Sequence, residues 1–145
     1  MATRSYQRRI LHLDGHWDTE DRIRELVEMA RLNCELVTAK NGADALKLIQ
    51  AEPFDLVIVD PWASEVTGFK ICRYIAANKP AIPVFFYAQE ALMNDRKFAE
   101  ASGAAAFFLA DDHEGLVSAM TDALADGLES NTGGRNVNEN LCSNK

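Results

Sequence analysis

The segment Asp55–Asp60, which reads DLVIVD, constrains the fold of this chain more than any other segment. Its four inner residues are apolar and three of them are β-branched, a composition that favours a strand. Because these apolar residues are continuous rather than alternating, both faces of the strand must be covered. Such coverage is typical of a strand within a parallel sheet that has helices on either side. The segment therefore predicts an α/β protein.

Short apolar runs alternate with segments of helical spacing along most of the chain. We expect strands at Ile10–Asp14, Cys34–Ala39, Asp55–Asp60, Ile82–Tyr87 and Ala105–Leu109. The expected helix boundaries are N-caps at Asp18, Asn41 and Asp111, a start at Gly68 for the third helix and a stop at Gly103 for the fourth. Five β–α units of this size predict a flavodoxin-like, doubly wound (βα)5 three-layer sandwich, with a parallel sheet of strand order 2-1-3-4-5.

Composition limits the domain organisation and the class of partner. We expect one folded domain over residues 1–127 and a disordered tail over residues 128–145, which has too few apolar residues to order itself. A formal net charge of −7 argues against nucleic-acid binding, because phosphate contacts need a basic face. No apolar run approaches the length of a membrane span. The cysteines Cys34, Cys72 and Cys142 have no paired spacing, which favours a reducing cytoplasm and indicates no metal framework.

Two of the expected strands end in an acid, at Asp14 and at Asp60. In the predicted order the first and third strands are neighbours, and ligands of such sheets bind beyond the carboxyl ends where the strand order reverses. We therefore expect the two carboxylates to lie close together. Such a pair can hold a hard divalent cation, and one carboxylate can act as a nucleophile toward phosphorus. The alternative, that each acid only caps a turn, is open for Asp14 and disfavoured for Asp60.

The order and spacing of several motifs resemble the receiver domain of response regulators, of the chemotaxis-regulator type. The resemblance covers residues 8–127 and rests on ILHLD, NGADALKLIQAEPFDLVIVD, IPVFFYA, SGAAAFFL and the spacing from Asp60 to Gly68. It implies that Asp60 accepts a phosphoryl group from a histidine kinase with the help of Mg²⁺. The implied metal contacts are Asp60, Asp14 through water and the backbone carbonyl of Trp62.

The chain departs from the pattern of that family at the positions that serve the phosphoryl group. Gly15 stands where the family has a second acidic metal ligand, so we expect weakened Mg²⁺ binding. Tyr87 or Ala88, depending on a one-residue choice of alignment, replaces a Ser or Thr. Ala110 replaces a Lys, and Phe107 takes the place of an aromatic residue that reports phosphorylation.

These departures favour an atypical, stand-alone receiver in two-component or phosphorelay signalling that is not an enzyme. We expect it to act in the cytoplasm, mainly through protein–protein interaction, and to need no cofactor apart from weakly bound Mg²⁺. The alternative is a phosphorylatable response regulator with Asp60 as the acceptor. A flavodoxin-like enzyme is a third possibility, but the acidic loop Gly15–Asp21 would repel a flavin phosphate.

The resemblance also implies where a protein partner docks. The partner is a histidine kinase or an output protein, and the expected surface is the face of the fourth helix, fifth strand and fifth helix. It includes Asn94, Asp95, Lys97 and the exposed side of residues 114–126. Trp17 and Trp62 flank the expected site; they could form a patch for a partner or narrow access to the site, although simple loop packing is favoured.

One histidine also needs an interpretation. His12 precedes Asp14 by two residues and therefore points to the same face of its strand. With His16 and Asp60 it could belong to a transition-metal site. A histidine packed in the core is the favoured interpretation.

Overall fold

The structure is a computed structural model that describes residues 7–15, 19–92 and 94–129. Within these residues five strands alternate with five helices. The strands are β1 (Arg8–Leu13), β2 (Cys34–Ala39), β3 (Leu56–Val59), β4 (Val84–Ala88) and β5 (Ala106–Leu109). The helices are α1 (Glu20–Met29), α2 (Gly42–Ala51), α3 (Gly68–Asn78), α4 (Asp95–Ser102) and α5 (His113–Glu129).

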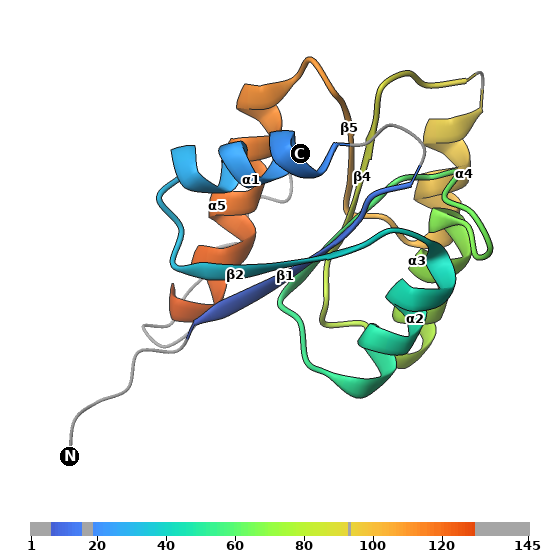
Figure 1. Ribbon diagram of the computed structural model, residues 1–145, viewed down its shortest axis with the longest axis horizontal. Coiled ribbons are helices and arrows are strands. Elements are labelled where there is room, and N and C mark those ends of the chain that lie inside the picture. Colours follow the sequence, from blue (N-terminus) through green and yellow to red (C-terminus); the bar gives the residue numbers. More distant parts are fainter. Residues whose placement is uncertain (1–6, 16–18, 93, 130–145) are drawn as a thin grey trace.

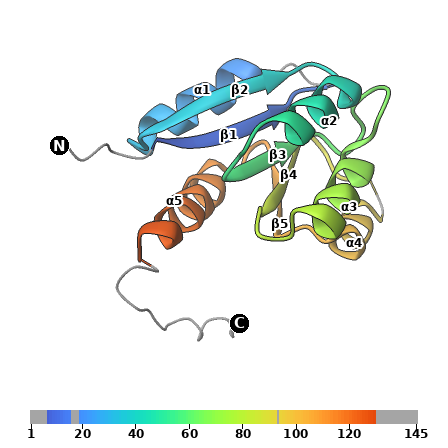
Figure 2. The same cartoon turned by 90° about the horizontal axis from the view of Figure 1, so that it is seen from below.

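All five strands are parallel and form one sheet in the order β2-β1-β3-β4-β5. Helices α1 and α5 cover one side of this sheet, and α2, α3 and α4 cover the other (Figure 1). Seen from below, β1 lies between β2 and β3 (Figure 2). The predicted three-layer sandwich and its strand order are confirmed.

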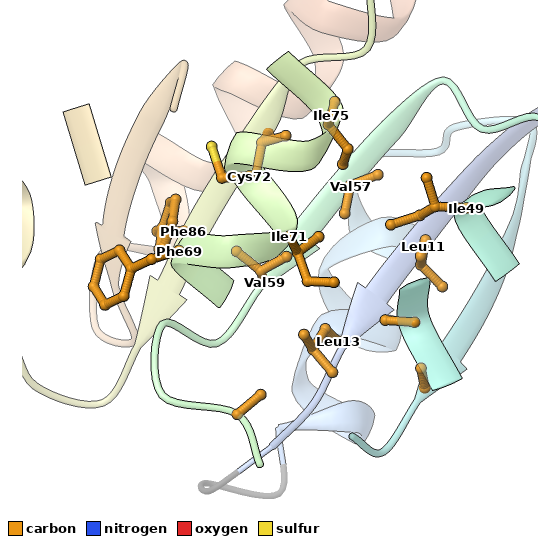
Figure 3. Packing of buried hydrophobic residues seen from close by; sticks show 14 of the residues in the cluster. Leu11, Leu13, Ile49, Val57, Val59, Phe69, Ile71, Cys72, Ile75 and Phe86 are labelled. Atoms are coloured by element: carbon orange, nitrogen blue, oxygen red, sulfur yellow. The ribbon is translucent and has the colours of Figure 1, made fainter. Parts of the chain in front are cut away.

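The continuous apolar run in β3 is explained by burial on both faces of the sheet. All four residues of β3 are fully buried. Val57 and Val59 pack with residues of α2 and α3 such as Ile49 and Ile71 (Figure 3). Leu56 and Ile58 belong to a second cluster, on the side of α1 and α5. Helices on both sides therefore require apolar residues at every position of the central strand.

Three of the predicted helix boundaries are confirmed. The Asn41 side chain accepts a hydrogen bond from the Asp44 backbone N–H at 2.9 Å, which caps α2. Helix α3 begins at Gly68, and α4 ends at Gly103 with φ of 104°, a left-handed conformation that glycine adopts without strain.

Two predicted N-caps are wrong. The N-cap of α1 is Thr19 rather than Asp18, which lies outside the described residues. At the start of α5, the Asp112 carboxylate accepts from the Gly115 backbone N–H at 3.0 Å, so Asp112 takes the place expected for Asp111. In both cases several polar residues precede the helix, and each of them could serve as a cap.

Helix α5 continues to Glu129, so the boundary predicted after residue 127 falls inside this helix. Residues 130–145 of the predicted tail lie outside the described part of the chain. Among the helices that the structure describes, none combines the length and the apolar character that crossing a membrane requires.

Gly42 joins the start of α2 to the loop that follows β3. Its backbone N–H donates to the Ser64 carbonyl at 2.8 Å, and a Cβ at this position would collide with the backbone of Val66. The glycine is therefore required by close approach of two backbones, and this contact fixes the loop that begins at Asp60.

We expect Gly42→Ala to lower the free energy of unfolding by about 2–4 kcal/mol, because the added methyl group forces the loop away from the helix. Urea denaturation followed by circular dichroism measures this change. Gln50→Ala, at an exposed position of the same helix, should stay within about 0.5 kcal/mol of the unmodified protein. Equal stabilities of the two variants would contradict the close approach.

Candidate functional site

Asp14 and Asp60 lie at the same edge of the sheet because β1 and β3 are paired. Leu13 and Val59 are register partners, and the Asp60 backbone N–H donates to the Leu13 carbonyl at 3.0 Å. Asp14 is 1% exposed and Asp60 is 4% exposed. The structure thus brings together the two acids that the sequence singled out, with both side chains turned from solvent.

The Asp14 carboxylate is held by donors on both oxygens. Its Oδ1 accepts from the Thr19 backbone N–H at 2.8 Å and lies 3.3 Å from the Thr19 hydroxyl. Its Oδ2 accepts from Lys40 Nζ at 3.0 Å. Burial by itself would raise the pKa of Asp14, but the hydrogen bonds from Thr19 and Lys40 outweigh it and hold the pKa below its usual value. Asp14 is therefore ionised at neutral pH.

Lys40 is a site residue that the sequence analysis missed. It follows β2 directly, and its ammonium lies 3.0 Å from Asp14 Oδ2 and 3.2 Å from Glu20 Oε1. The hydrogen bond to Asp14 raises the pKa of Lys40 above its ordinary value. The available signal was its position: a residue that ends the strand next to β1 must lie beside the end of β1.

His12 lies in the core beneath these charges, as the favoured interpretation expected. It is 1% exposed, and its Nε2 lies 3.2 Å from the Thr19 hydroxyl oxygen. Burial lowers the pKa of His12 to about 4, so the imidazole is neutral at pH 7. His16 and Trp17 lie outside the described residues. Within the described ranges, no group of three or more His, Cys, Asp and Glu side chains is placed to hold a metal ion.

The space beside Gly15 is filled by the loop after β3. A side chain at this position would place its Cβ 2.8 Å from the Ala63 Cα and 2.8 Å from Asp60 Oδ2. Real Cβ atoms do not approach other atoms this closely, so any larger residue must displace the Ala63 backbone. The glycine therefore removes a potential acidic ligand and also leaves no room for one.

The Asp60 carboxylate is oriented by the loop that follows it. Its Oδ1 accepts from the Trp62 backbone N–H at 2.9 Å. The spacing to Gly68 has a physical reason, since the Gly68 N–H donates to the Pro61 carbonyl at 3.0 Å and a Cβ on Gly68 would collide with the Asp60 carbonyl. The start of α3 is thus packed directly against the backbone of Asp60.

Trp62 lies on the rim of the site and is 47% exposed. Its ring packs edge-on against Phe69, with centroids 5.0 Å apart, and its indole N–H lies 3.4 Å from Asp95 Oδ2. The same Asp95 oxygen accepts from the Leu92 backbone N–H at 2.8 Å. Asp95 was expected on an exposed docking face, and this expectation is wrong because the side chain is buried. It links Trp62, in the loop after β3, to Leu92, in the loop after β4.

The ends of β4 and β5 carry no small hydroxyl and no ammonium group. Tyr87 is buried on the side of α1 and α5, where its hydroxyl donates to the Ala110 carbonyl at 3.4 Å. Burial raises the pKa of this phenol. Ala88 and Ala110 are both buried and contribute only methyl groups. Phe107 stacks on Phe86, with ring centroids 5.9 Å apart.

Comparison with known proteins identifies the family. Residues 10–121, well over half of the chain, match the response regulator receiver domain family. The chain belongs to this family. The matched segment of the receiver domain begins in β1 and ends within α5, so it contains both acids of the site.

A curated relative agrees with this assignment. The chain is 35% identical to the response regulator protein PilR from Pseudomonas aeruginosa over 69 residues, which are 46% of this chain and 16% of that protein. It thus spans only a small part of this curated relative.

Its fold is similar to the signal receiver domain of an HD domain-containing protein from Pseudomonas fluorescens Pf-5. The TM-score is 0.77 at 20% identity, and the match covers 91% of this chain and 97% of that one. The chemotaxis response regulator CheY4 of Vibrio cholerae gives a TM-score of 0.69 at 20% identity, and the match covers 81% of this chain and 99% of that one.

Receiver domains typically bind Mg²⁺ at the phosphorylation site, and the residues that the structure describes at this site do not fit that ion. Both oxygens of Asp14 accept hydrogen bonds, one of them from a cation. Gly15 supplies no ligand, and one Asp60 oxygen accepts from the Trp62 amide. Mg²⁺ requires near-octahedral oxygen ligands at about 2.0–2.1 Å. The predicted set of Asp14, Asp60 and the Trp62 carbonyl therefore offers a metal little to replace its hydration shell.

The buried neutral state of His12 predicts a pH dependence of stability. The pKa of His12 is about 4 in the folded protein and near 6.5 in the unfolded chain, so the unfolded chain takes up the proton first. The free energy of unfolding should therefore fall by about 3 kcal/mol as pH drops from 6.5 to 4. His12→Gln should lose this component, measured as a shallower slope in urea titrations over that range. Parallel slopes in the two proteins would show that the imidazole is not held neutral.

Proposed function

We propose that this receiver domain acts through protein–protein contacts, in cytoplasmic two-component or phosphorelay signalling, without depending on phosphorylation of Asp60. The observation that carries this proposal is that β4 ends in Ala88 and β5 is followed by Ala110. Phosphoryl transfer spreads negative charge over three equatorial oxygens, and catalysis consists mainly of fixed counter-charges and donors. Two buried methyl groups at these positions stabilise no such charge.

The alternative function is a phosphorylatable regulator with Asp60 as the acceptor of a phosphoryl group from a histidine kinase. Asp60 itself retains the carboxylate that acts as nucleophile. A second observation favours this alternative, because the Arg22 guanidinium lies 3.5 Å from the Ala110 carbonyl oxygen and 2.9 Å from His113 Nε2. A cation is therefore present near the end of β5, although it is contributed by α1.

A group of exposed apolar side chains supports the role in protein contacts. Trp62, Leu92 and Phe98 are 47%, 59% and 52% exposed. Phe69 connects two of them, with its ring centroid 5.0 Å from that of Trp62 and 6.1 Å from that of Phe98. Exposed aromatic residues of this kind are enriched at protein interfaces. Phe98 belongs to α4, which is one element of the α4, β5 and α5 face on which we propose that a histidine kinase or an output protein docks.

Phosphorylation is tested with small phosphodonors. Incubation with Mg²⁺ and acetyl phosphate should leave the intact mass unchanged, and beryllofluoride should leave the amide ¹H–¹⁵N spectrum unchanged, because Ala88 and Ala110 supply neither a hydroxyl nor an ammonium group to a phosphoryl group on Asp60. Asp60→Asn serves as the matched control. An added mass of about 80 Da, as expected for one phosphoryl group, that is absent from the Asp60→Asn variant would overturn the proposal in favour of the phosphorylatable regulator.

The contact surface is tested by complementation in cells in which loss of this chain gives a measurable phenotype. Asp60→Asn should restore the phenotype to near the unmodified level, whereas Phe98→Glu should lower it at least tenfold because it places a charge in the apolar group. Gln50→Glu adds the same charge on exposed α2 and should have no effect. Thermal denaturation verifies that each variant is folded. Loss of function in Asp60→Asn together with retention in Phe98→Glu would refute the assignment.

A further inference from the structure

We propose that the Lys40 ammonium is the resident cation of the acidic site, so that this receiver domain keeps Asp14 charged and buried without a divalent metal. The inference deepens the proposed function and rests on it, since both concern the same carboxylates. It is nevertheless tested without any phosphodonor, so the two can fail separately.

The backbone places Lys40 beside Asp14. Ala39 and Leu13 are register partners in the β1–β2 pairing, and the Asp14 backbone N–H donates to the Ala39 carbonyl at 2.9 Å. Lys40 and Asp14 are the next residues of two adjacent parallel strands. Strand register therefore places the two residues side by side, and from there the Lys40 ammonium reaches Asp14 Oδ2 at 3.0 Å.

A second carboxylate completes the cation site. Glu20, in the first turn of α1, places Oε1 3.2 Å from the Lys40 ammonium and is itself bound by Arg24 at 3.1 Å. Asp14 is fixed on its other oxygen by Thr19. The ammonium is thus held between two carboxylates whose own positions are set by hydrogen bonds and an ion pair.

Burial makes a cation at this place obligatory. Only 1% of the Asp14 side chain is exposed, and a buried carboxylate is tolerated when it is paired with a cation and hydrogen-bonded. In a receiver that binds a divalent metal, the ion shares this task. Here the Lys40 ammonium neutralises the buried Asp14 carboxylate. The closed space beside Gly15 leaves no room for a further acid that would favour a doubly charged ion.

A divalent ion would have to displace the ammonium or lie beside it. The first requires breaking the hydrogen bonds of Lys40 to both acids, and the second places like charges within a few ångströms of each other in a partly buried site. Both arrangements oppose metal binding. Removing the Lys40 charge should therefore create metal affinity at Asp14.

Thermal denaturation with and without 10 mM MgCl₂, at constant ionic strength, tests this inference. The Tm of the unmodified protein should not change with Mg²⁺. Lys40→Met should lower the Tm in the absence of Mg²⁺, and Mg²⁺ should restore several degrees of it, because an ion that binds only the folded state stabilises it. Lys47→Met removes the same charge from an exposed position of α2 and should show neither effect.

Direct titration measures the same change in affinity. With Mn²⁺ as the probe, monitored by calorimetry and by tryptophan fluorescence, Lys40→Met should bind at least tenfold more tightly than the unmodified protein. Asp14→Asn introduced into the Lys40→Met variant should abolish that gain. Lys40→Gln repeats the titration with a polar side chain if the Met variant does not fold.

Two results would overturn the inference: a Tm of the unmodified protein that rises with Mg²⁺, or folded Lys40 variants that gain no metal affinity. Mg²⁺ binding without phosphorylation would remove this inference and leave the proposed function. Phosphorylation of Asp60 in a protein whose Tm does not change with Mg²⁺ would refute the proposed function and leave this inference standing.

Discussion

The pairing of β1 with β2 on one side and with β3 on the other is the constraint on which the site depends. Parallel strands end at the same edge of a sheet, so the residues that follow them meet without help from long loops. Asp14, Lys40 and Asp60 are such residues, and each follows a strand whose register is fixed by buried apolar neighbours. The positions of the charges are thus consequences of packing in the core.

The same arrangement balances the cost of burying charge. Asp14 remains ionised because Thr19 and Lys40 donate to it, and His12 lies below it as an uncharged ring. A cation that belongs to the chain neutralises the carboxylate at every concentration of dissolved metal, whereas a bound ion does so only by mass action. The charge of Asp14 is therefore paired with a cation that the folded chain itself supplies.

The sequence predicted the sheet because its signals are local and redundant. The unbroken apolar run in β3 was recognised from periodicity alone, and the meeting of the two strand-terminal acids followed from the strand order. The family resemblance agreed with both predictions. Helix starts were less certain where several polar residues are adjacent, as before α1 and α5. Lys40 was missed and Asp95 was misplaced for a different reason. A charged residue in a single sequence is typical of a solvated surface, and the contacts that hold these two come from other elements of the fold.

The closed space around Gly15 also bears on how such a domain can change over generations. A codon change that introduces an acid at this position places its Cβ against the backbone of Ala63 and the carboxylate of Asp60. An acidic side chain at position 15 therefore requires a compensating change in the loop that carries Ala63, and the substitution made alone carries a steric penalty.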